Sequence, residues 1–125
     1  MKSPYQQLGG SEGIRQLASE FYQAMDELSA TAEIRAMHAD NLDEIKEKLF
    51  EYLSGWLGGP ALYSQQYGTV CLTEPHSHYQ ITAAHRDQWL ACMDKALERI
   101  NASDEIKHML KQPMFELADL VKNTA

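Results

Sequence analysis

The stretch Glu74–Trp89, EPHSHYQITAAHRDQW, joins a histidine-rich loop to the longest helical pattern in the chain. Pro75 has no amide hydrogen and disfavours helix at the residue before it, so a new local geometry is expected at His76. Thr82 is a residue type that caps helices, and a helix is predicted from about residue 83 to residue 101. Imidazole is the commonest metal ligand in proteins. The stretch therefore indicates either a site for a metal or a haem iron beside a helix junction, or a group of solvated histidines.

Length, composition and charge restrict the class of protein. The chain has 125 residues of which 44% are hydrophobic, which predicts one domain, residues 1–125, with one packed core. The net charge of −7 argues against nucleic acid or an anionic membrane as a partner, because both require a basic surface. We find neither a signal-like start nor a long apolar run, so a cytoplasmic location is expected. Cys71 and Cys92 form no CxxC pair and are expected to be thiols.

Apolar residues recur at three- and four-residue steps in most of the remaining sequence, which predicts helices. Such faces follow Ser11, Asp40 or Asn41, and Ser103, and each of these residue types can cap a helix. A shorter helical segment is expected after Thr31. Because no stretch alternates convincingly between apolar and polar residues, the predicted fold class is all-α.

Glycine and proline mark the predicted helix ends. Gly58-Gly59-Pro60 should terminate the central helix, since glycine suits the left-handed residue after a helix and proline prevents continuation. Residues 61–75 lack helical periodicity and are expected to form a long irregular connection, a kind of segment that is often functional. Pro113 lies inside the last pattern and predicts a kink or break near Gln112.

With this layout the chain resembles a group II truncated haemoglobin, over nearly its whole length. The resemblance rests on the following motifs in this order: Tyr5–Gly10 (YQQLGG), Phe21-Tyr22, Trp56–Pro60 (WLGGP), Tyr63, His76 and Arg86–Met93 (RDQWLACM). It implies a truncated globin-like two-over-two helical sandwich around haem b. It also implies that the irregular connection wraps the haem edge, and that ferrous iron binds dioxygen reversibly, with nitric oxide and carbon monoxide as further ligands.

The resemblance assigns roles to four polar residues. His76 matches the proximal iron ligand; the alternative is a surface histidine, with His78 as a competing ligand. Tyr22 and Trp89 match the distal residues that hydrogen-bond a gas ligand, although either could simply be a core residue. His38 falls at the corner position where the family carries Tyr, Phe or His, so it is expected in the distal pocket or on the iron, or else in an exposed loop.

Other predicted cofactor contacts are less specific. Ile45 and Leu49 align with the distal helix and offer only hydrocarbon, so hydrogen bonding there must come from elsewhere. The remaining predicted haem contacts, several of them toward propionates, are Lys48, Tyr63, Tyr67, Tyr79, Ile81 and Arg86. Phe50 and Tyr52 are expected to be core or haem-edge aromatics, whereas His85 and His108 are expected to be solvated.

The family resemblance implies detoxification of nitric oxide and other reactive nitrogen species, or of peroxide. The chain carries no glycine-rich strand–helix turn for a flavin or nicotinamide, so turnover would need an external reductase. The alternatives are a non-enzymatic protein for oxygen binding, oxygen transport or gas sensing, and a helical protein without haem.

Overall fold

The computed structural model describes residues 2–69, 71–72 and 76–124, and every regular element within these residues is helical. In chain order the elements are α1 (Pro4–Gln7), α2 (Gly10–Glu27), the 3-10 turn η1 (Ser29–Thr31), α3 (Ala32–Ala36), α4 (Asp43–Trp56), α5 (Leu62–Tyr67), α7 (Ala83–Arg99) and α8 (Asp104–Leu120). The predicted all-α class is confirmed. The change of geometry predicted at His76 depends on Glu74 and Pro75, and these two residues lie outside the described residues.

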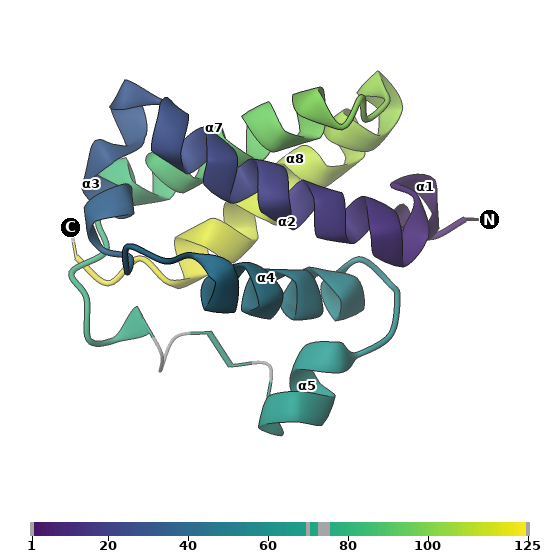
Figure 1. Ribbon diagram of the computed structural model, residues 1–125, viewed down its shortest axis with the longest axis horizontal. Helices are drawn as coiled ribbons and strands as arrows, with labels where there is room; N and C mark the ends of the chain where they lie inside the picture. The colour runs from purple at the N-terminus through teal and green to yellow at the C-terminus, as the bar shows by residue number, and fades with distance from the viewer. Residues whose placement is uncertain (1, 70, 73–75, 125) are drawn as a thin grey trace.

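The four long helices form two layers, with α2 and α4 on one side and α7 and α8 on the other. Helix α2 packs against both α4 and α7, and α7 packs against α8. Figure 1 shows α2 crossing in front of α7, with α4 running below α2. The apolar face of α2 forms the centre of the core, since Ile14, Leu17, Phe21 and Met25 are at most 1% exposed. The helical periodicity predicted for this segment is therefore confirmed.

The beginning of the chain differs from the prediction. Ser3 and Gln6 form a reciprocal capping box that starts α1, a helix that the periodicity did not indicate. Helix α2 then begins at Gly10, after Gly9 has adopted a left-handed φ of 104°. Ser11 consequently lies inside the helix and does not cap it.

The corner between α2 and α4 also corrects two predictions. The Thr31 hydroxyl donates to the carbonyl oxygens of Met25 (3.0 Å) and Leu28 (2.9 Å), so Thr31 does not cap α3 through its side chain. At the start of α4, the backbone N–H of Asp43 donates to Oδ1 of Asn41 at 2.8 Å. The N-cap residue of α4 is Leu42, and no side chain caps the helix, so the predicted capping by Asp40 or Asn41 was wrong.

Helix α4 ends before Gly58-Gly59-Pro60, as predicted. The expectation of irregular chain over residues 61–75 was wrong for its first part, because α5 forms at Leu62–Tyr67. The Tyr63 ring in α5 packs against the Tyr52 ring of α4, and this tertiary contact supports a short helix without apolar periodicity.

The two helices of the second layer start as predicted. Thr82 caps α7, with its hydroxyl oxygen accepting from the backbone N–H of His85 at 3.2 Å, and Ser103 caps α8 in the same way. Helix α8 continues unbroken through Pro113, so the predicted break does not occur. The buried residues Leu110 and Met114 pack the helix against the core on both sides of the proline. No helix in the described part of the chain is long and apolar enough to cross a bilayer.

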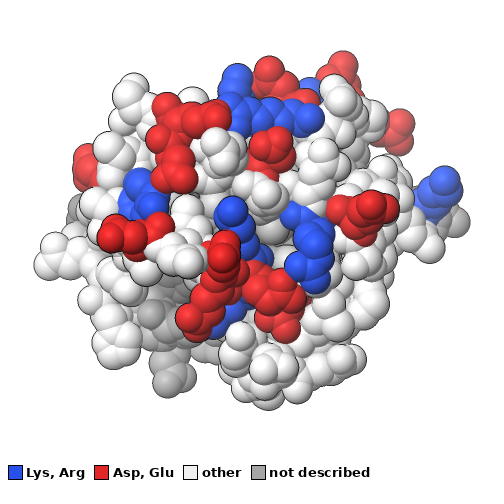
Figure 2. All heavy atoms as spheres, viewed as in Figure 1, with Lys and Arg blue, Asp and Glu red and all other residues white. Residues whose placement is uncertain are grey.

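Charged side chains cover the surface in mixed groups. On the face shown in Figure 2, Lys and Arg side chains lie among Asp and Glu side chains. Arg15, for example, pairs with Glu47 at 2.7 Å, and Arg99 pairs with both Glu20 and Glu27. This face therefore offers no continuous basic surface of the kind that binds phosphate backbones.

Candidate functional site

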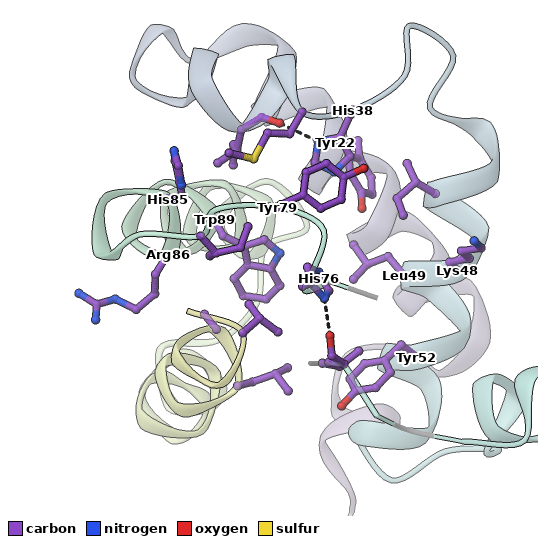
Figure 3. A pocket seen from close by; sticks show the side chains of 18 of the residues that line it. Tyr22, His38, Lys48, Leu49, Tyr52, His76, Tyr79, His85, Arg86 and Trp89 are labelled. Atoms are coloured by element: carbon purple, nitrogen blue, oxygen red, sulfur yellow. Dashed lines mark hydrogen bonds between the residues drawn. The ribbon is translucent and has the colours of Figure 1, made fainter. Parts of the chain in front are cut away.

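A cavity of about 410 Å³ lies between the two helical layers and the loop that precedes α7 (Figure 3). Its size falls within the range of small-molecule and cofactor sites, about 300–1,000 Å³. Among the residues predicted for the site, those that line the cavity are Tyr22, His38, Ile45, Lys48, Leu49, Tyr63, His76, Tyr79, Ile81, Arg86 and Trp89. The structure thus brings together every predicted site residue except Tyr67.

His76 presents an imidazole with a defined tautomer. Its Nδ1 lies 2.6 Å from the carbonyl oxygen of Leu72. A carbonyl oxygen only accepts hydrogen bonds, so Nδ1 carries the proton and Nε2 of the neutral ring keeps its lone pair. A backbone carbonyl that orients an imidazole in this way is a usual outer-shell partner of metal-ligating histidines. The predicted competitor His78 is exposed and does not line the cavity.

The loop that carries His76 is held by the segment after α8, in an arrangement that we call the Asn123 clamp. Oδ1 of Asn123 accepts from the backbone N–H of Ile81 at 2.8 Å, and its Nδ2 donates to the carbonyl oxygens of Tyr79 (2.9 Å) and His76 (3.4 Å). The backbone N–H groups of Asn123 and Thr124 both donate to the carbonyl oxygen of Ile81. The clamp therefore fixes the backbone on the C-terminal side of His76.

Tyr22 enters the cavity from α2 and is 4% exposed. Its ring packs edge-on against Phe21 at 4.9 Å and against His38 at 5.7 Å between centroids. Burial, with a smaller contribution from Cys92, raises the pKa of the Tyr22 phenol, which keeps the hydroxyl protonated. Within the described residues its hydroxyl has no hydrogen-bond partner, so the O–H group remains able to donate to a molecule in the cavity.

His38 is fixed in the same way as His76. Its Nδ1 lies 2.7 Å from the carbonyl oxygen of Ile34 and must carry the proton. The neutral ring therefore offers the cavity only the lone pair of Nε2, which can accept from Tyr22 or ligate a metal. To donate a hydrogen bond to a gas ligand, His38 would first have to be protonated at Nε2.

Trp89 completes the polar part of the cavity. It lies on α7, is half-buried, and its ring centroid is 5.1 Å from that of Phe21. Its indole N–H can only donate, and no described residue accepts from it. Among the predicted distal residues, Tyr22 and Trp89 therefore each have a donor hydrogen with no acceptor in the described part of the protein.

The wall contributed by α4 is mainly apolar. Ile45 and Leu49 line it, and Lys48 reaches the rim, where its Nζ lies 3.7 Å from Glu44 and 5.8 Å from the centre of the Tyr67 ring. Tyr67 itself is 42% exposed and does not line the cavity. The predicted direct contact between Tyr67 and a cofactor thus has no support in this geometry.

Arg86 borders the cavity, but Figure 3 shows its guanidinium directed away from it. The guanidinium pairs with Asp119 at 2.9 Å and with Asp87 at 3.0 Å, and it lies over the Phe115 ring at 4.7 Å. The two carboxylates, which raise its pKa, already occupy the donors that the sequence assigned to a propionate. The propionate contact stays a prediction.

His85 was expected to be solvated, and this was wrong. Its side chain is 11% exposed and lines the cavity. Nδ1 accepts from the backbone N–H of Thr82 at 3.1 Å, so the proton lies on Nε2, which is 3.1 Å from a carboxylate oxygen of Glu33. The N3 position after a capping threonine was the signal that could have placed this ring at the helix start.

Several aliphatic wall residues were also missed as site residues. None of them was predicted to belong to the site, yet all four line the cavity: Ile34, Met37, Leu117 and Val121. Their helical spacing indicates that they face the interior, but it does not distinguish residues that line a cavity from residues in a packed core. Of the predicted haem-edge aromatics, Tyr52 lines the cavity whereas Phe50 is buried in the core.

A two-over-two helical fold with an apolar cavity between its layers, and an imidazole lone pair inside that cavity, defines the class of truncated globins. Comparison with known proteins agrees. The bacterial-like globin family model matches residues 3–123. A group 2 truncated hemoglobin of Bacillus subtilis is 30% identical over 108 residues, which cover 86% of this chain and 79% of that protein.

Solved structures are similar over the full length. A cold-adapted truncated hemoglobin of Pseudoalteromonas haloplanktis TAC125 is 36% identical with a TM-score of 0.94, covering 99% of this chain and 100% of that one. A group II 2-on-2 hemoglobin of Agrobacterium tumefaciens is 31% identical with a TM-score of 0.94, covering 100% and 97%. The chain belongs to the bacterial-like globin family. As a globin, it is a haem-binding protein that binds diatomic gases such as oxygen.

Proposed function

We propose that His76 is the proximal iron ligand of a haem b group held in the cavity. One observation carries this assignment: the bond from Nδ1 to the Leu72 carbonyl leaves the His76 lone pair on Nε2, inside an apolar cavity. The aliphatic side chains of Ile45 and Leu49 suit a flat macrocycle, while Lys48 at the rim is placed to meet a propionate. When bound, the haem supplies a ferrous iron at which a diatomic gas binds.

Tyr22 and Trp89 are the groups that we propose to stabilise the gas ligand. Each has a donor hydrogen without a protein partner, and each comes from a different helix. A hydrogen bond to a ligand that carries partial negative charge contributes about 1–3 kcal/mol, or about one to two decades in the rate of ligand release. When no gas is present, Nε2 of His38 accepts a hydrogen bond from the Tyr22 hydroxyl or ligates the iron itself. Because Tyr22 has a single hydroxyl proton, the bond to His38 breaks when Tyr22 donates to a gas ligand.

The hydrogen bonds proposed for Tyr22 and Trp89 slow the release of oxygen, and slow release suits a reaction of the bound oxygen better than oxygen transport. We propose that the protein detoxifies nitric oxide or peroxide in the cytoplasm. Nitric oxide, dioxygen and one electron give nitrate. Peroxide takes two electrons and two protons to give two waters. In both cases Tyr22 and Trp89 polarise the reacting oxygen atoms. The electrons come from an external reductase or small reductant, since the sequence holds no flavin or nicotinamide motif.

The first test is the visible spectrum of the haem-loaded protein in its oxidised, reduced and oxygenated forms. The His76→Ala variant should lose the stable oxygenated spectrum. The His78→Ala variant, which changes an exposed imidazole two residues away, should retain it. Retention of the spectrum in His76→Ala, with loss in His78→Ala, would move the proximal role to the other histidine.

The second test separates an enzyme from a binder. Oxygenated protein is mixed with nitric oxide in a stopped-flow instrument, and nitrate formed is compared with the rate of oxygen dissociation. Slow dissociation with fast, stoichiometric nitrate supports detoxification. Fast oxygen exchange with little nitrate, and no peroxide consumption, would instead support the non-enzymatic oxygen-binding or sensing protein.

A further inference from the structure

Three tyrosine rings form a continuous series of contacts from the cavity wall to the surface. Tyr52 of α4 and Tyr63 of α5 both line the cavity, and their ring centroids are 5.4 Å apart with planes at 80°. Tyr67, one turn further along α5, is 4.6 Å from Tyr63 and is 42% exposed. We refer to Tyr52, Tyr63 and Tyr67 as the tyrosine series. It leads from the proposed haem site to a surface that solutes can reach.

Packing alone gives an incomplete account of this arrangement. Tyr67 buries only part of its ring and lies outside the cavity, so the cavity lining does not support the cofactor contact predicted for it. A phenylalanine at this place would make the same ring contact. What tyrosine adds is an oxidisable phenol, and aromatic rings in van der Waals contact exchange electrons readily.

We propose that the tyrosine series carries oxidising equivalents, generated from hydrogen peroxide in the cavity, to Tyr67, which then oxidises phenolic compounds at the surface. The proposal rests on the haem-based peroxide reduction proposed above. A strong oxidant is required because phenols resist oxidation by dioxygen itself. Hydrogen peroxide is such an oxidant, and its reduction to water drives the oxidation of the tyrosines.

The electrons and protons balance as follows. Reduction of one hydrogen peroxide to two waters takes up two electrons and two protons. Each electron is passed inward along the series, and Tyr67 releases its hydroxyl proton to solvent and becomes a neutral phenoxyl radical. A phenol in solution restores Tyr67 by giving it one electron and one proton. The sum is two phenols and one peroxide giving two phenoxyl radicals and two waters.

The environment favours the outer end of the series as the place where the radical rests. Burial, with Tyr63 nearby, raises the pKa of the Tyr52 phenol, so loss of its proton is unfavourable at the inner end. The Tyr67 hydroxyl has water as a proton acceptor. One competitor exists among the described tyrosines, because Tyr79 lines the cavity and is also 47% exposed.

The experiment uses the haem-loaded full chain, hydrogen peroxide and a nitroso spin trap. Peptide mass spectrometry then gives the trapped adduct at each tyrosine, divided by the peroxide consumed. The unaltered protein should be labelled at Tyr67. Tyr63→Phe should lose this label although Tyr67 is still present and exposed. Tyr5→Phe, which removes the hydroxyl of a ring that does not line the cavity, should keep the label.

Each other outcome contradicts the proposal. An equal label at Tyr67 in Tyr63→Phe would show that peroxide-derived oxidants reach it without the series. A label confined to Tyr79, abolished by Tyr79→Phe, would assign the exit to that ring. Peroxide consumption without labelled tyrosine would refute the series and leave the proposed function intact. A protein that binds haem but consumes no peroxide refutes both this proposal and the peroxide function. The Soret spectrum recorded before labelling establishes that haem is bound, and the measured peroxide consumption then distinguishes the two cases.

Discussion

Removal of the Asn123 side chain should loosen the loop that carries His76 and speed the loss of haem. Asn123→Ala deletes the bonds to the Ile81 N–H (2.8 Å) and the Tyr79 carbonyl (2.9 Å), and a longer one to the His76 carbonyl (3.4 Å). The two backbone bonds to the Ile81 carbonyl remain available. Each typical hydrogen bond contributes about 0.5–1.5 kcal/mol, and this side chain is exposed, so the two shorter bonds together contribute about 1–2 kcal/mol. Such a loss raises the open population of the loop by a factor of about 5–30.

Two assays measure this change directly. Hydrogen exchange of the backbone amides in residues 76–82 reports opening of the loop. Transfer of haem from the loaded protein to an excess of apomyoglobin reports the rate at which the cofactor leaves. Lys122→Ala is the matched control, because it removes the neighbouring exposed side chain and none of the clamp bonds. Asn123→Asp keeps the acceptor for the Ile81 N–H but loses the donor to the carbonyl oxygens of Tyr79 and His76. Its rate of haem loss should therefore lie between those of Lys122→Ala and Asn123→Ala. Repulsion between the carboxylate and the two carbonyl oxygens would raise this rate further.

One combination of results would exclude a role of Asn123 in holding the loop. If Asn123→Ala and Lys122→Ala lose haem at the same rate and show equal exchange in residues 76–82, the clamp does not hold the loop. A general loss of stability would instead raise exchange in α2 as well, where the core residue Phe21 is fully buried. Faster exchange confined to residues 76–82 therefore identifies loss of the clamp, because general destabilisation would also speed exchange in α2.

Three further predictions concern other parts of the fold. Tyr22→Phe should speed oxygen release by about one to two decades, because it removes a donor and little volume; unchanged stopped-flow rates would contradict the distal role. Gly13→Ala should destabilise the fold by about 1–3 kcal/mol in urea unfolding, since the new Cβ would lie 1.8 Å from the Leu8 carbonyl oxygen, and this overpacking outweighs the ordinary helical gain of about 0.5–1 kcal/mol. Iodoacetamide at neutral pH should modify exposed Cys71 and spare buried Cys92, whose pKa burial raises to about 11; labelling of both thiols in the folded protein would show that the core opens.

The sequence predicted the long helices well, because their signals are local. The apolar face of α2 and the caps Thr82 and Ser103 are each set by residues within one or two turns. The errors lie where a distant residue decides the structure. Helix α5 depends on the contact between Tyr63 and Tyr52, and α8 passes through Pro113 because both flanking turns are anchored in the core.

The sequence predicted which residues line the site, but it predicted only in part where their side chains point. A motif can place Arg86 on the right turn of α7, and it does line the cavity. The motif contains no information about Asp119, which is 33 residues away in sequence and draws the guanidinium outward. His85 shows the converse case, since a capping box and Glu33 turn a residue expected in solvent into part of the wall.

The two imidazoles that face the cavity show why residue type alone leaves the roles open. His38 and His76 each bond through Nδ1 to the carbonyl four residues earlier, Ile34 and Leu72 respectively, so each directs an unprotonated Nε2 inward. On bond chemistry alone both could ligate iron. Their surroundings distinguish them, because the His38 ring contacts Tyr22, whose hydroxyl can occupy the His38 lone pair, whereas the loop of His76 is clamped by Asn123. Tyr22→Phe should therefore free His38 as well as remove a donor, and a six-coordinate ferrous spectrum appearing in that variant alone would identify Tyr22 as the group that keeps His38 off the iron.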